Sequence, residues 1–348
     1  MKFSAVLIIV LLISVFAKAQ KSYKFDFGNG RIKKGYISVT PDTKFANEKG
    51  YGFTNGSEVT AVDRGGKSVN ADYITSTKPF YFSVNLPDGN YDVKIILGDK
   101  KRISATTVRA ECRRLFLENI RTAKGKFVTE TFTVNVRDSL IRDEKGTIVK
   151  AVRLKPREYN YLHWDNFLTI EFNDSLPKVC AIEITPNKTA TTIFLAGNST
   201  VVDQDKEPWA AWGQMIPRFF APETAAVANY AESGEALNSF QSARRLEKIL
   251  SVMKPGDYLF IEFGHNDMKQ KGPGIGPFTS YKKLLKQYIA EVKKKGGIPV
   301  LVTSMHRRSF DNDGKIINTL LEYPDAVRQT AKEENVAMVD LNAMSKVL

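Results

Sequence analysis

The sequence predicts a multidomain protein in which an all-β sandwich precedes an α/β domain with a parallel sheet. Three observations support this prediction. Up to about residue 185, short runs of β-branched and aromatic residues alternate with turn-forming residues. From about residue 190 onward, apolar strand patterns alternate with amphipathic helix patterns. A short polar stretch at 186–189, which begins with a proline, separates the two regions.

The first residues have the pattern of an export signal. Lys2 gives a positive start, an apolar run follows over residues 5–16, and Ala17-Lys18-Ala19 offers small residues for a signal peptidase. We expect residues 1–19 to be a signal peptide cleaved after Ala19; the alternative is an uncleaved anchor. Gln20 stands where a lipid-anchored protein would have cysteine. The expected location is periplasmic or secreted, with no membrane span after cleavage.

The first domain is expected over residues 20–186 as a β-sandwich. Strands are predicted at 23–27, 80–86, 91–97, 127–136 and 167–172. The segment Pro87-Asp88-Gly89-Asn90 is a strong turn signal. Both cysteines, Cys112 and Cys180, lie in this domain, in apolar stretches. A disulfide between them and a pair of buried free thiols are both compatible with the pattern.

The second domain is expected over residues 190–348. Strands are predicted at 192–196, 225–231, 258–263, 298–303 and 336–341, and helices at 209–220, 237–253, 280–294 and 325–334. Repeated strand–helix units predict a parallel sheet with right-handed crossovers. Ligands of such sheets bind beyond the carboxyl ends of the strands. The turns that follow the strands are therefore the place to look for chemistry.

Three of these turns carry the groups that acyl transfer requires, a nucleophile and donors for an oxyanion. Ser199 follows the first strand in a turn that contains a glycine. Gly234 follows the second strand and has no side chain to block its N–H. Asn266 follows the third strand and offers amide N–H groups. Taken singly, such residues are more often helix caps or turn formers, so their order and spacing carry the argument.

The same turns resemble the conserved blocks of the SGNH (GDSL-like) hydrolases, and more narrowly of the rhamnogalacturonan acetylesterase branch. The matching segments are IFLAGNSTVVDQDKEPWAAWGQ (193–214), NYAESG (229–234) and PGDYLFIEFGHND (255–267). The resemblance spans residues 192–348. It implies that Ser199 is the nucleophile and that Gly234 and Asn266 donate to the oxyanion. It also implies a flavodoxin-like, three-layer α/β/α fold with a five-stranded parallel sheet.

The first domain resembles the galactose-binding-like β-sandwich that precedes this hydrolase domain in some bacterial members. The segments FDFGNG (25–30) and YGF (51–53) carry this looser resemblance.

The sequence departs from the SGNH pattern at two points. The usual Asp before the serine is Asn198, which keeps the shape and loses the charge. The family's last block, Asp-x-x-His, has no counterpart before Leu348. We therefore expect a chain truncated before that block, with little activity because a serine hydroxyl is a poor nucleophile without a base. Two alternatives stay open: His306 replaces the missing base, or the chain is catalytically silent.

The formal net charge of +13 favours acidic partners. Export argues against nucleic acid, so the expected partner is an acetylated polysaccharide or oligosaccharide of acidic character. His306, Arg307 and Arg308 follow the fourth strand and are candidates for binding the substrate, the two arginines through a carboxylate of an acidic sugar. No cofactor and no metal are expected, since no histidine or cysteine pair has a ligand spacing.

The expected function is removal of acetyl groups from a pectic, rhamnogalacturonan-like polysaccharide of plant cell walls. The alternatives are a silent carbohydrate-binding fragment and a lipase or thioesterase of the same superfamily. Trp209 and Trp212 are expected to pack in the core of their helix rather than to stack on sugar.

Overall fold

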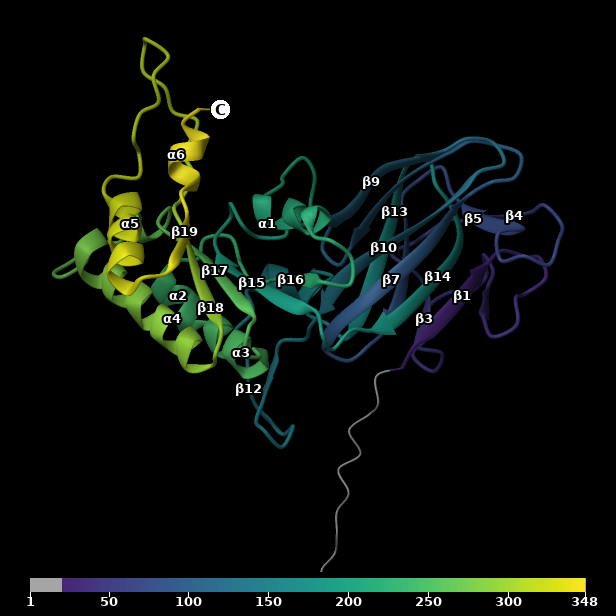
Figure 1. Cartoon of the computed structure of the whole chain (residues 1–348), viewed down its shortest axis with the longest axis horizontal. Coiled ribbons are helices and arrows are strands. Elements are labelled where there is room, and N and C mark those ends of the chain that lie inside the picture. Colours follow the sequence, from purple (N-terminus) through teal and green to yellow (C-terminus); the bar gives the residue numbers. More distant parts are fainter. Residues whose placement is uncertain (1–20, 348) are drawn as a thin grey trace, which may run out of the picture.

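The computed structural model describes residues 21–347, so the predicted signal peptide lies outside the described residues. Two lobes lie side by side along the long axis of the molecule (Figure 1). The front lobe is β-rich, and the second lobe is an α/β domain with a parallel sheet, which confirms the predicted fold class. Within residues 21–347, no helix has both the length and the apolar character needed to cross a bilayer.

The front lobe consists of two sheets that enclose an apolar core. One sheet has the order β10-β7-β14-β1-β2 with β5 and β4 attached, and the other has the order β3-β6-β13-β8-β9. The strands are β1 (Tyr23–Phe27), β2 (Ile37–Val39), β3 (Tyr51–Thr54), β4 (Thr60–Asp63), β5 (Asp72–Thr75), β6 (Phe80–Asn85), β7 (Gly89–Gly98), β8 (Ser104–Ala110), β9 (Arg114–Thr122), β10 (Phe127–Val136), β13 (Phe167–Leu176) and β14 (Lys178–Pro186). Aromatic rings from both sheets, among them Phe25, Phe27 and Phe82, meet in the core.

The two cysteines do not form a disulfide. Cys112 and Cys180 are both free and buried. The Cys180 thiol donates to the carbonyl oxygen of Gly98 at 3.5 Å. A buried free cysteine behaves as a small apolar residue whose S–H group is a weak donor. Of the two possibilities that the sequence left open, the structure has the free thiols.

The second lobe contains a five-stranded parallel sheet of order β16-β15-β17-β18-β19. Its strands are β15 (Thr191–Gly197), β16 (Ala225–Asn229), β17 (Tyr258–Glu262), β18 (Ile298–Val302) and β19 (Ala337–Val339). Counted along the chain this is the doubly wound order 2-1-3-4-5, in which the direction of winding reverses beside the first strand. The carboxyl ends of β15 and β17 therefore form the expected ligand-binding edge.

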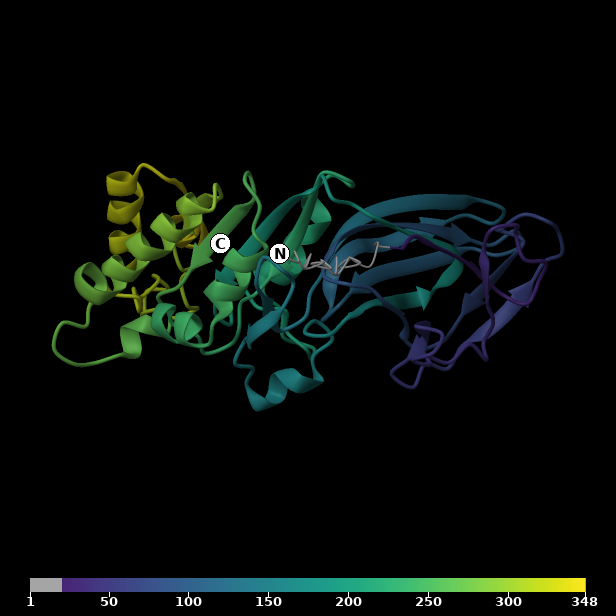
Figure 2. The same ribbon diagram turned by 90° about the horizontal axis from the view of Figure 1, so that it is seen from below.

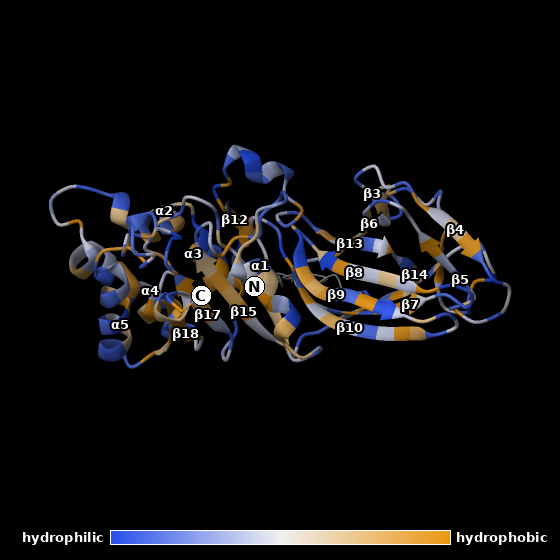
Figure 3. Ribbon diagram, turned by 90° about the horizontal axis from the view of Figure 1, so that it is seen from above, coloured by the Kyte–Doolittle hydropathy of each residue, from blue (hydrophilic) through white to orange (hydrophobic). Residues whose placement is uncertain are grey.

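Helices cover both faces of this sheet. One face packs on α2 (Leu237–Ser242), α3 (Arg245–Val252), α4 (Lys282–Lys294) and α5 (Tyr323–Glu334), and α5 is largely hydrophilic in Figure 3. The other face packs on α1 (Trp212–Met215) and the 3-10 turn η2 (Ile216–Phe219). The remaining elements are η3 (Asp267–Lys269), the π-helical turn η4 (Pro277–Tyr281) and α6 (Leu341–Ser345). Because α1 and η2 are short, an apolar groove of about 280 Å³ stays open beside Trp212, Phe219 and Phe260.

Two predicted helices differ from those in the structure. The helix predicted over 237–253 is divided into α2 and α3, because Arg244 adopts a left-handed conformation with φ 63°. The helix predicted over 209–220 begins only at Trp212. Trp209 is 69% exposed, so the expectation that it packs in a helix core is wrong. Trp212 is half-buried and packs on the sheet.

The front lobe contacts the edge strand β16 of the second lobe directly. The buried guanidinium of Arg114 donates to the carbonyl oxygen of Val227 at 2.8 Å, and that of Arg137 donates to the carbonyl oxygen of Asn229. These two carbonyls are two residues apart and point to the same side of the strand. The front lobe therefore caps the outer edge of the parallel sheet.

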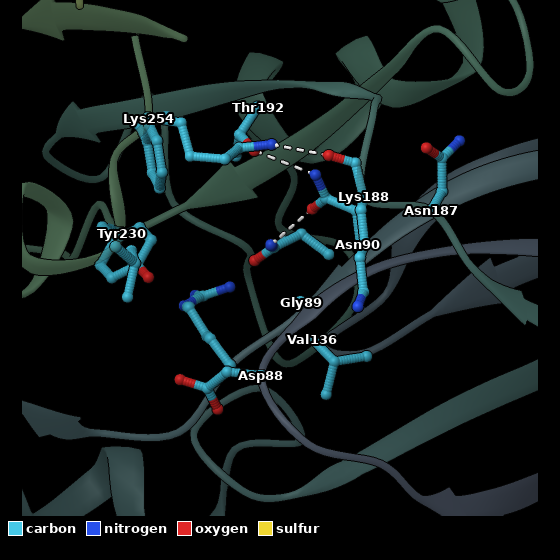
Figure 4. A pocket seen from close by; sticks show the side chains of 13 residues that line it. Asp88, Gly89, Asn90, Val136, Asn187, Lys188, Thr192, Tyr230 and Lys254 are labelled. Carbon is cyan, nitrogen blue, oxygen red and sulfur yellow. Dashed lines mark hydrogen bonds between the residues drawn. The ribbon is translucent and has the colours of Figure 1, made fainter. Parts of the chain in front are cut away.

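Beside this junction, a pocket of about 330 Å³ lies between the two lobes (Figure 4). Asn90 lines it and donates to the Thr192 hydroxyl at 2.9 Å. The strand pair β11 (Leu140–Arg142) and β12 (Ile148–Ala151) and the 3-10 turn η1 (Pro156–Asn160) also leave the sandwich (Figure 2). Val152 and Trp164, from this part of the chain, pack into the core of the second lobe.

Candidate active site

Ser199 is exposed in a tight turn at the carboxyl end of β15. The N–H groups of Val201 and Val202 both donate to the carbonyl oxygen of Asn198 at 3.0 Å, which closes the turn around the serine. Gly197 is required here because a β-carbon at this position would lie 2.4 Å from Cγ2 of Val201. The turn is therefore closely packed, and Ser199 is its exposed residue.

Asn198 is fully buried beneath this turn. Its Oδ1 accepts from the backbone N–H of Thr200 at 3.1 Å and lies 3.0 Å from the Thr200 hydroxyl oxygen. An aspartate oxygen would accept the same backbone hydrogen bond, so asparagine can replace the family's aspartate in supporting the turn. Among the described residues, Nδ2 of Asn198 has no hydrogen-bond partner.

The second turn, which follows β16, is joined to the first by a backbone hydrogen bond. The N–H of Glu232 donates to the carbonyl oxygen of Gly197 at 3.2 Å. Gly234 is exposed in this turn and has φ +85°, a conformation that favours glycine. Gly234 therefore lies in a turn attached directly to the end of β15.

The third turn, which follows β17, is joined to the second by a side chain. Nδ2 of Asn266 donates to the carbonyl oxygen of Glu235 at 2.9 Å, one residue after Gly234. Asp267 accepts from the N–H of Leu237 and from the N–H of Gly264, both at 2.9 Å, so it also fixes the start of α2. Burial raises the pKa of Asp267 to about 6. The structure thus brings the turns of Ser199, Gly234 and Asn266 together at one edge of the sheet.

Glu262, the last residue of β17, lies beneath the first turn and is fully buried. Its Oε1 accepts from the Thr200 hydroxyl at 2.7 Å, and its Oε2 accepts from the indole N–H of Trp212 at 2.5 Å. Burial raises the pKa of this carboxyl to about 7, and the two hydrogen bonds oppose that rise. The sequence held a signal for this residue, because one acidic residue interrupts an otherwise apolar buried strand.

The three histidines contact groups other than Ser199. His265 Nε2 donates to the carbonyl oxygen of Met305 at 3.0 Å, and its Nδ1 lies 3.9 Å from Glu262 Oε1. His163 is buried, with Nδ1 3.4 Å from Asp203 Oδ2. Burial lowers the pKa of both rings to about 4. His306 is held by its backbone N–H, which donates to the Ser345 hydroxyl at 2.9 Å.

The turn after β18 is tied to the third turn by Arg307. Its guanidinium donates to the carbonyl oxygen of His265 at 3.1 Å and lies 3.4 Å from the Thr319 hydroxyl. These contacts occupy the Arg307 side chain within the fold. Arg308 is exposed beside it. Of the two arginines singled out in the sequence, Arg308 is therefore the one with a side chain open to solvent.

The front lobe reaches the loop that follows Ser199. Oδ2 of the buried Asp203 lies 3.2 Å from Nε of Arg114 and 3.4 Å from His163, and its Oδ1 accepts from Asn229 at 2.7 Å. Arg113 donates to the carbonyl oxygen of Gln204 at 3.0 Å. Sequence reasoning missed these links, because no local pattern tells which charged residues of a sandwich face a second domain.

Sequence reasoning also missed two cations of the front lobe at the second turn. Lys155 Nζ and Arg157 Nη2 each lie 2.7 Å from the carbonyl oxygen of Ser233. Lys155 also pairs with Glu235 at 2.6 Å, and Arg157 pairs with Glu232. In the sequence the two cations appear only as charges in a turn-rich stretch, for which solvent exposure is the ordinary interpretation.

Comparison with known proteins finds a family match for each part of the chain. Residues 23–142 match the family "Beta-agarase/YXIM esterase-like, galactose-binding domain-like". Residues 195–347 match the "GDSL-like Lipase/Acylhydrolase family".

Three relatives come from Bacillus subtilis. Rhamnogalacturonan acetylesterase RhgT is 44% identical over 158 residues, which cover 45% of this chain and 67% of RhgT. The probable rhamnogalacturonan acetylesterase YesY is 41% identical over 44% of this chain and 70% of its own length. The esterase YxiM is 29% identical over 98% of this chain and 86% of its own. The crystal structure of YxiM superposes with a TM-score of 0.43 at 27% identity, covering 94% of this chain and 87% of that one.

Proposed function

The chain belongs to the GDSL-like lipase/acylhydrolase family and is a carboxylic ester hydrolase, and on this premise we propose that it removes acetyl groups from a pectic, rhamnogalacturonan-like polysaccharide. The observation that supports the proposal is the junction of three turns at the carboxyl edge of the sheet, with Ser199 exposed in the first of them. We further propose that the domains span residues 20–186 and 190–348, and that the protein is exported to the periplasm or secreted.

In the proposed reaction, Ser199 Oγ attacks the carbonyl carbon of the acetyl ester. The negative charge that develops on the carbonyl oxygen is held by the N–H of Ser199, the N–H of Gly234 and the side-chain amide of Asn266. Collapse of this intermediate releases the sugar hydroxyl and leaves an acetyl group on Ser199. Water then attacks this acetyl group and releases acetate, which restores the serine.

We propose that turnover by the 348-residue chain is slow. A general base must take the proton of the Ser199 hydroxyl, and removal of that base costs several orders of magnitude in rate. Among the described residues, the contacts of His163, His265 and His306 are made with groups other than Ser199. A small soluble base that enters the site should then raise the rate.

The test measures acetate release from O-acetylated rhamnogalacturonan oligosaccharides, with and without added imidazole. We expect slow release that imidazole accelerates and that Ser199→Ala abolishes at every imidazole concentration. Ser175→Ala, an exposed serine in the front lobe, is the control and should behave as the parent protein does. Oligosaccharide binding without any Ser199-dependent release would replace the esterase with a silent carbohydrate-binding protein. Fast release without imidazole would overturn the claim of slow turnover.

The apolar groove beside Trp212 favours a second candidate, hydrolysis of longer acyl esters or thioesters. The groove is lined by Met215, Ile216, Phe219 and Phe260 among others, all apolar. The test compares p-nitrophenyl acetate, butyrate and octanoate. Preference for acetate supports the carbohydrate esterase. A preference for octanoate that is lost in Phe219→Asp would support the second candidate instead.

A further inference from the structure

We propose that Lys155 and Arg157, two residues of the front lobe, fix the orientation and the polarity of the peptide bond that presents the Gly234 N–H. The inference rests on the proposed function, because this N–H matters for catalysis only if it donates to the oxyanion. It makes the segment that leaves the sandwich and packs on the second lobe a working part of the active site.

The carbonyl oxygen of Ser233 accepts hydrogen bonds from two cations. Lys155 Nζ donates to this oxygen at 2.7 Å, and Arg157 Nη2 donates to it at 2.7 Å. The same peptide unit carries the N–H of Gly234. Two cations therefore bind one end of the peptide whose other end is the candidate oxyanion donor.

A cation on a carbonyl oxygen draws electrons along the peptide bond and raises the positive charge on the N–H at its far end. Hydrogen bonds from charged donors are also roughly twice as strong as those from neutral donors. Both effects should make the Gly234 N–H a better donor to an oxyanion. Because Arg157 is half exposed, solvent weakens its share, and Lys155, with 31% of its side chain exposed, should contribute more.

The two contacts also fix the direction of the N–H. Gly234 has φ +85°, and a peptide that precedes a glycine in a turn can rotate between two allowed orientations. Such a rotation would reverse the direction of the N–H. With the Ser233 oxygen held by two cations, the rotation would break two charge-assisted hydrogen bonds.

The cations are themselves held in place by buried groups. Lys155 pairs with Glu235, and Arg157 Nε lies 2.8 Å from Glu232 Oε1. The turn η1 contains Arg157 and begins directly after Lys155. It is anchored by Glu158, which accepts from the Lys155 backbone N–H at 2.8 Å and pairs with Arg245 of α3 at 2.5 Å. Two carboxylates balance the two cations, so the cluster is suited to positioning a peptide rather than to binding a free anion.

A spectroscopic test isolates this peptide, because Ser233-Gly234 is the only Ser-Gly step in the sequence. Cell-free synthesis of the 348-residue chain with carbonyl-¹³C serine and ¹⁵N glycine should give one correlated amide signal. In Lys155→Met and Arg157→Met we expect the Gly234 proton and the Ser233 carbonyl carbon to shift upfield. Lys150→Met is the matched control, because Lys150 also pairs with a glutamate of the second lobe, Glu247, at 2.5 Å. An unmoved signal in both variants would overturn the proposal.

A kinetic test then links the peptide to catalysis. We measure Ser199-dependent acetate release in the presence of imidazole. Lys155→Met should lower kcat about tenfold with KM within about twofold, less than the loss of a whole oxyanion donor. Lys155→Arg should restore most of the rate, and Lys150→Met should keep the parent rate. An unchanged kcat in Lys155→Met would refute the link to catalysis. If the parent shows no Ser199-dependent release at all, the proposed function fails, and the spectroscopic test still decides the positioning of the peptide.

Discussion

The Thr200 hydroxyl donates a 2.7 Å hydrogen bond to Oε1 of Glu262, and this contact joins the residue after Ser199 to the end of β17. The second carboxyl oxygen of Glu262 accepts from Trp212. Within residues 21–347, no lysine or arginine forms an ion pair with Glu262, and the nearest basic nitrogen is Nδ1 of His265 at 3.9 Å. The turn that exposes Ser199 therefore rests on a buried carboxyl without a cationic partner.

Glu262 should make the protein less stable at alkaline pH. Burial raises the pKa of its carboxyl from 4.5 to about 7, so the folded state keeps a proton that the unfolded state has lost. The free energy of unfolding should therefore fall as the pH rises from about 4.5 to above 7, by about 3 kcal/mol in total. Urea denaturation at pH 5 and pH 8 measures this change. Glu262→Gln should remove this fall in stability between pH 5 and pH 8. Glu144→Gln, at an exposed loop position, should retain the fall. Parallel pH profiles for the parent and Glu262→Gln would contradict the assignment.

The pair of Arg114 and Asp203 should hold the two lobes together. Both side chains are fully buried, with Nε 3.2 Å from Oδ2. Arg114→Met leaves a buried carboxylate without its main cation and should lower the free energy of unfolding by about 3 to 5 kcal/mol. Lys78→Met removes an exposed pair with Glu58 and should change it by less than about 1 kcal/mol. Denaturation followed by tryptophan fluorescence compares the two variants. Equal stabilities would show that the buried pair contributes no more than the exposed one.

Gly213 should resist substitution because α1 approaches the turn after Ser199 closely. A β-carbon at this position would lie 2.2 Å from the carbonyl oxygen of Val201 and 2.9 Å from Nδ2 of Asn229. Gly213→Ala should therefore destabilise the protein by about 2 to 3 kcal/mol. Gly276→Ala is the control, since its β-carbon would meet only the Thr279 hydroxyl, at 3.2 Å, and its backbone is extended. Thermal unfolding measures both, and a Gly213→Ala variant as stable as the control would refute the close approach.

Arg307 and Arg308 should differ in their effects on substrate preference. Arg307 donates to the carbonyl oxygen of His265, so Arg307→Ala should reduce acetate release from charged and neutral oligosaccharides alike. Arg308 is exposed, and Arg308→Ala should lower only the rate on galacturonate-containing substrates, by about fivefold or less for a solvated charge pair. The ratio of the two rates is the measurement. If Arg308→Ala leaves the ratio of the rates on charged and neutral substrates unchanged, this turn does not recognise the galacturonate carboxylate.

The sequence predicted the parts of the fold that follow from local periodicity. Strands such as β1 and β10 have their predicted bounds, because alternating and aromatic-rich runs are local signals. The break between α2 and α3 was not predictable, since Arg244 adopts a positive φ that nothing in its own sequence favours. The three turns of the candidate site were predictable because they follow strands of one parallel sheet.

The contacts that support the site were not predictable in the same way. Lys155 and Arg157 lie 78 and 76 residues from Ser233 in the chain, and only the packing of their segment on the second lobe brings them to it. Arg114 looked like one more charge on a strand of the sandwich, yet it is fully buried at the junction. Long-range charge pairing of this kind leaves no periodic trace in a single sequence.

The guanidinium groups that cover β16 set a condition for protein engineering. Without Arg114 and Arg137, the carbonyls of Val227 and Asn229 would lie on an open strand edge, which is a ready template for another chain. A hydrolase lobe produced alone should therefore self-associate through β16. A chimera that replaces the front lobe with another carbohydrate-binding module would need donors at the same two places to remain monomeric.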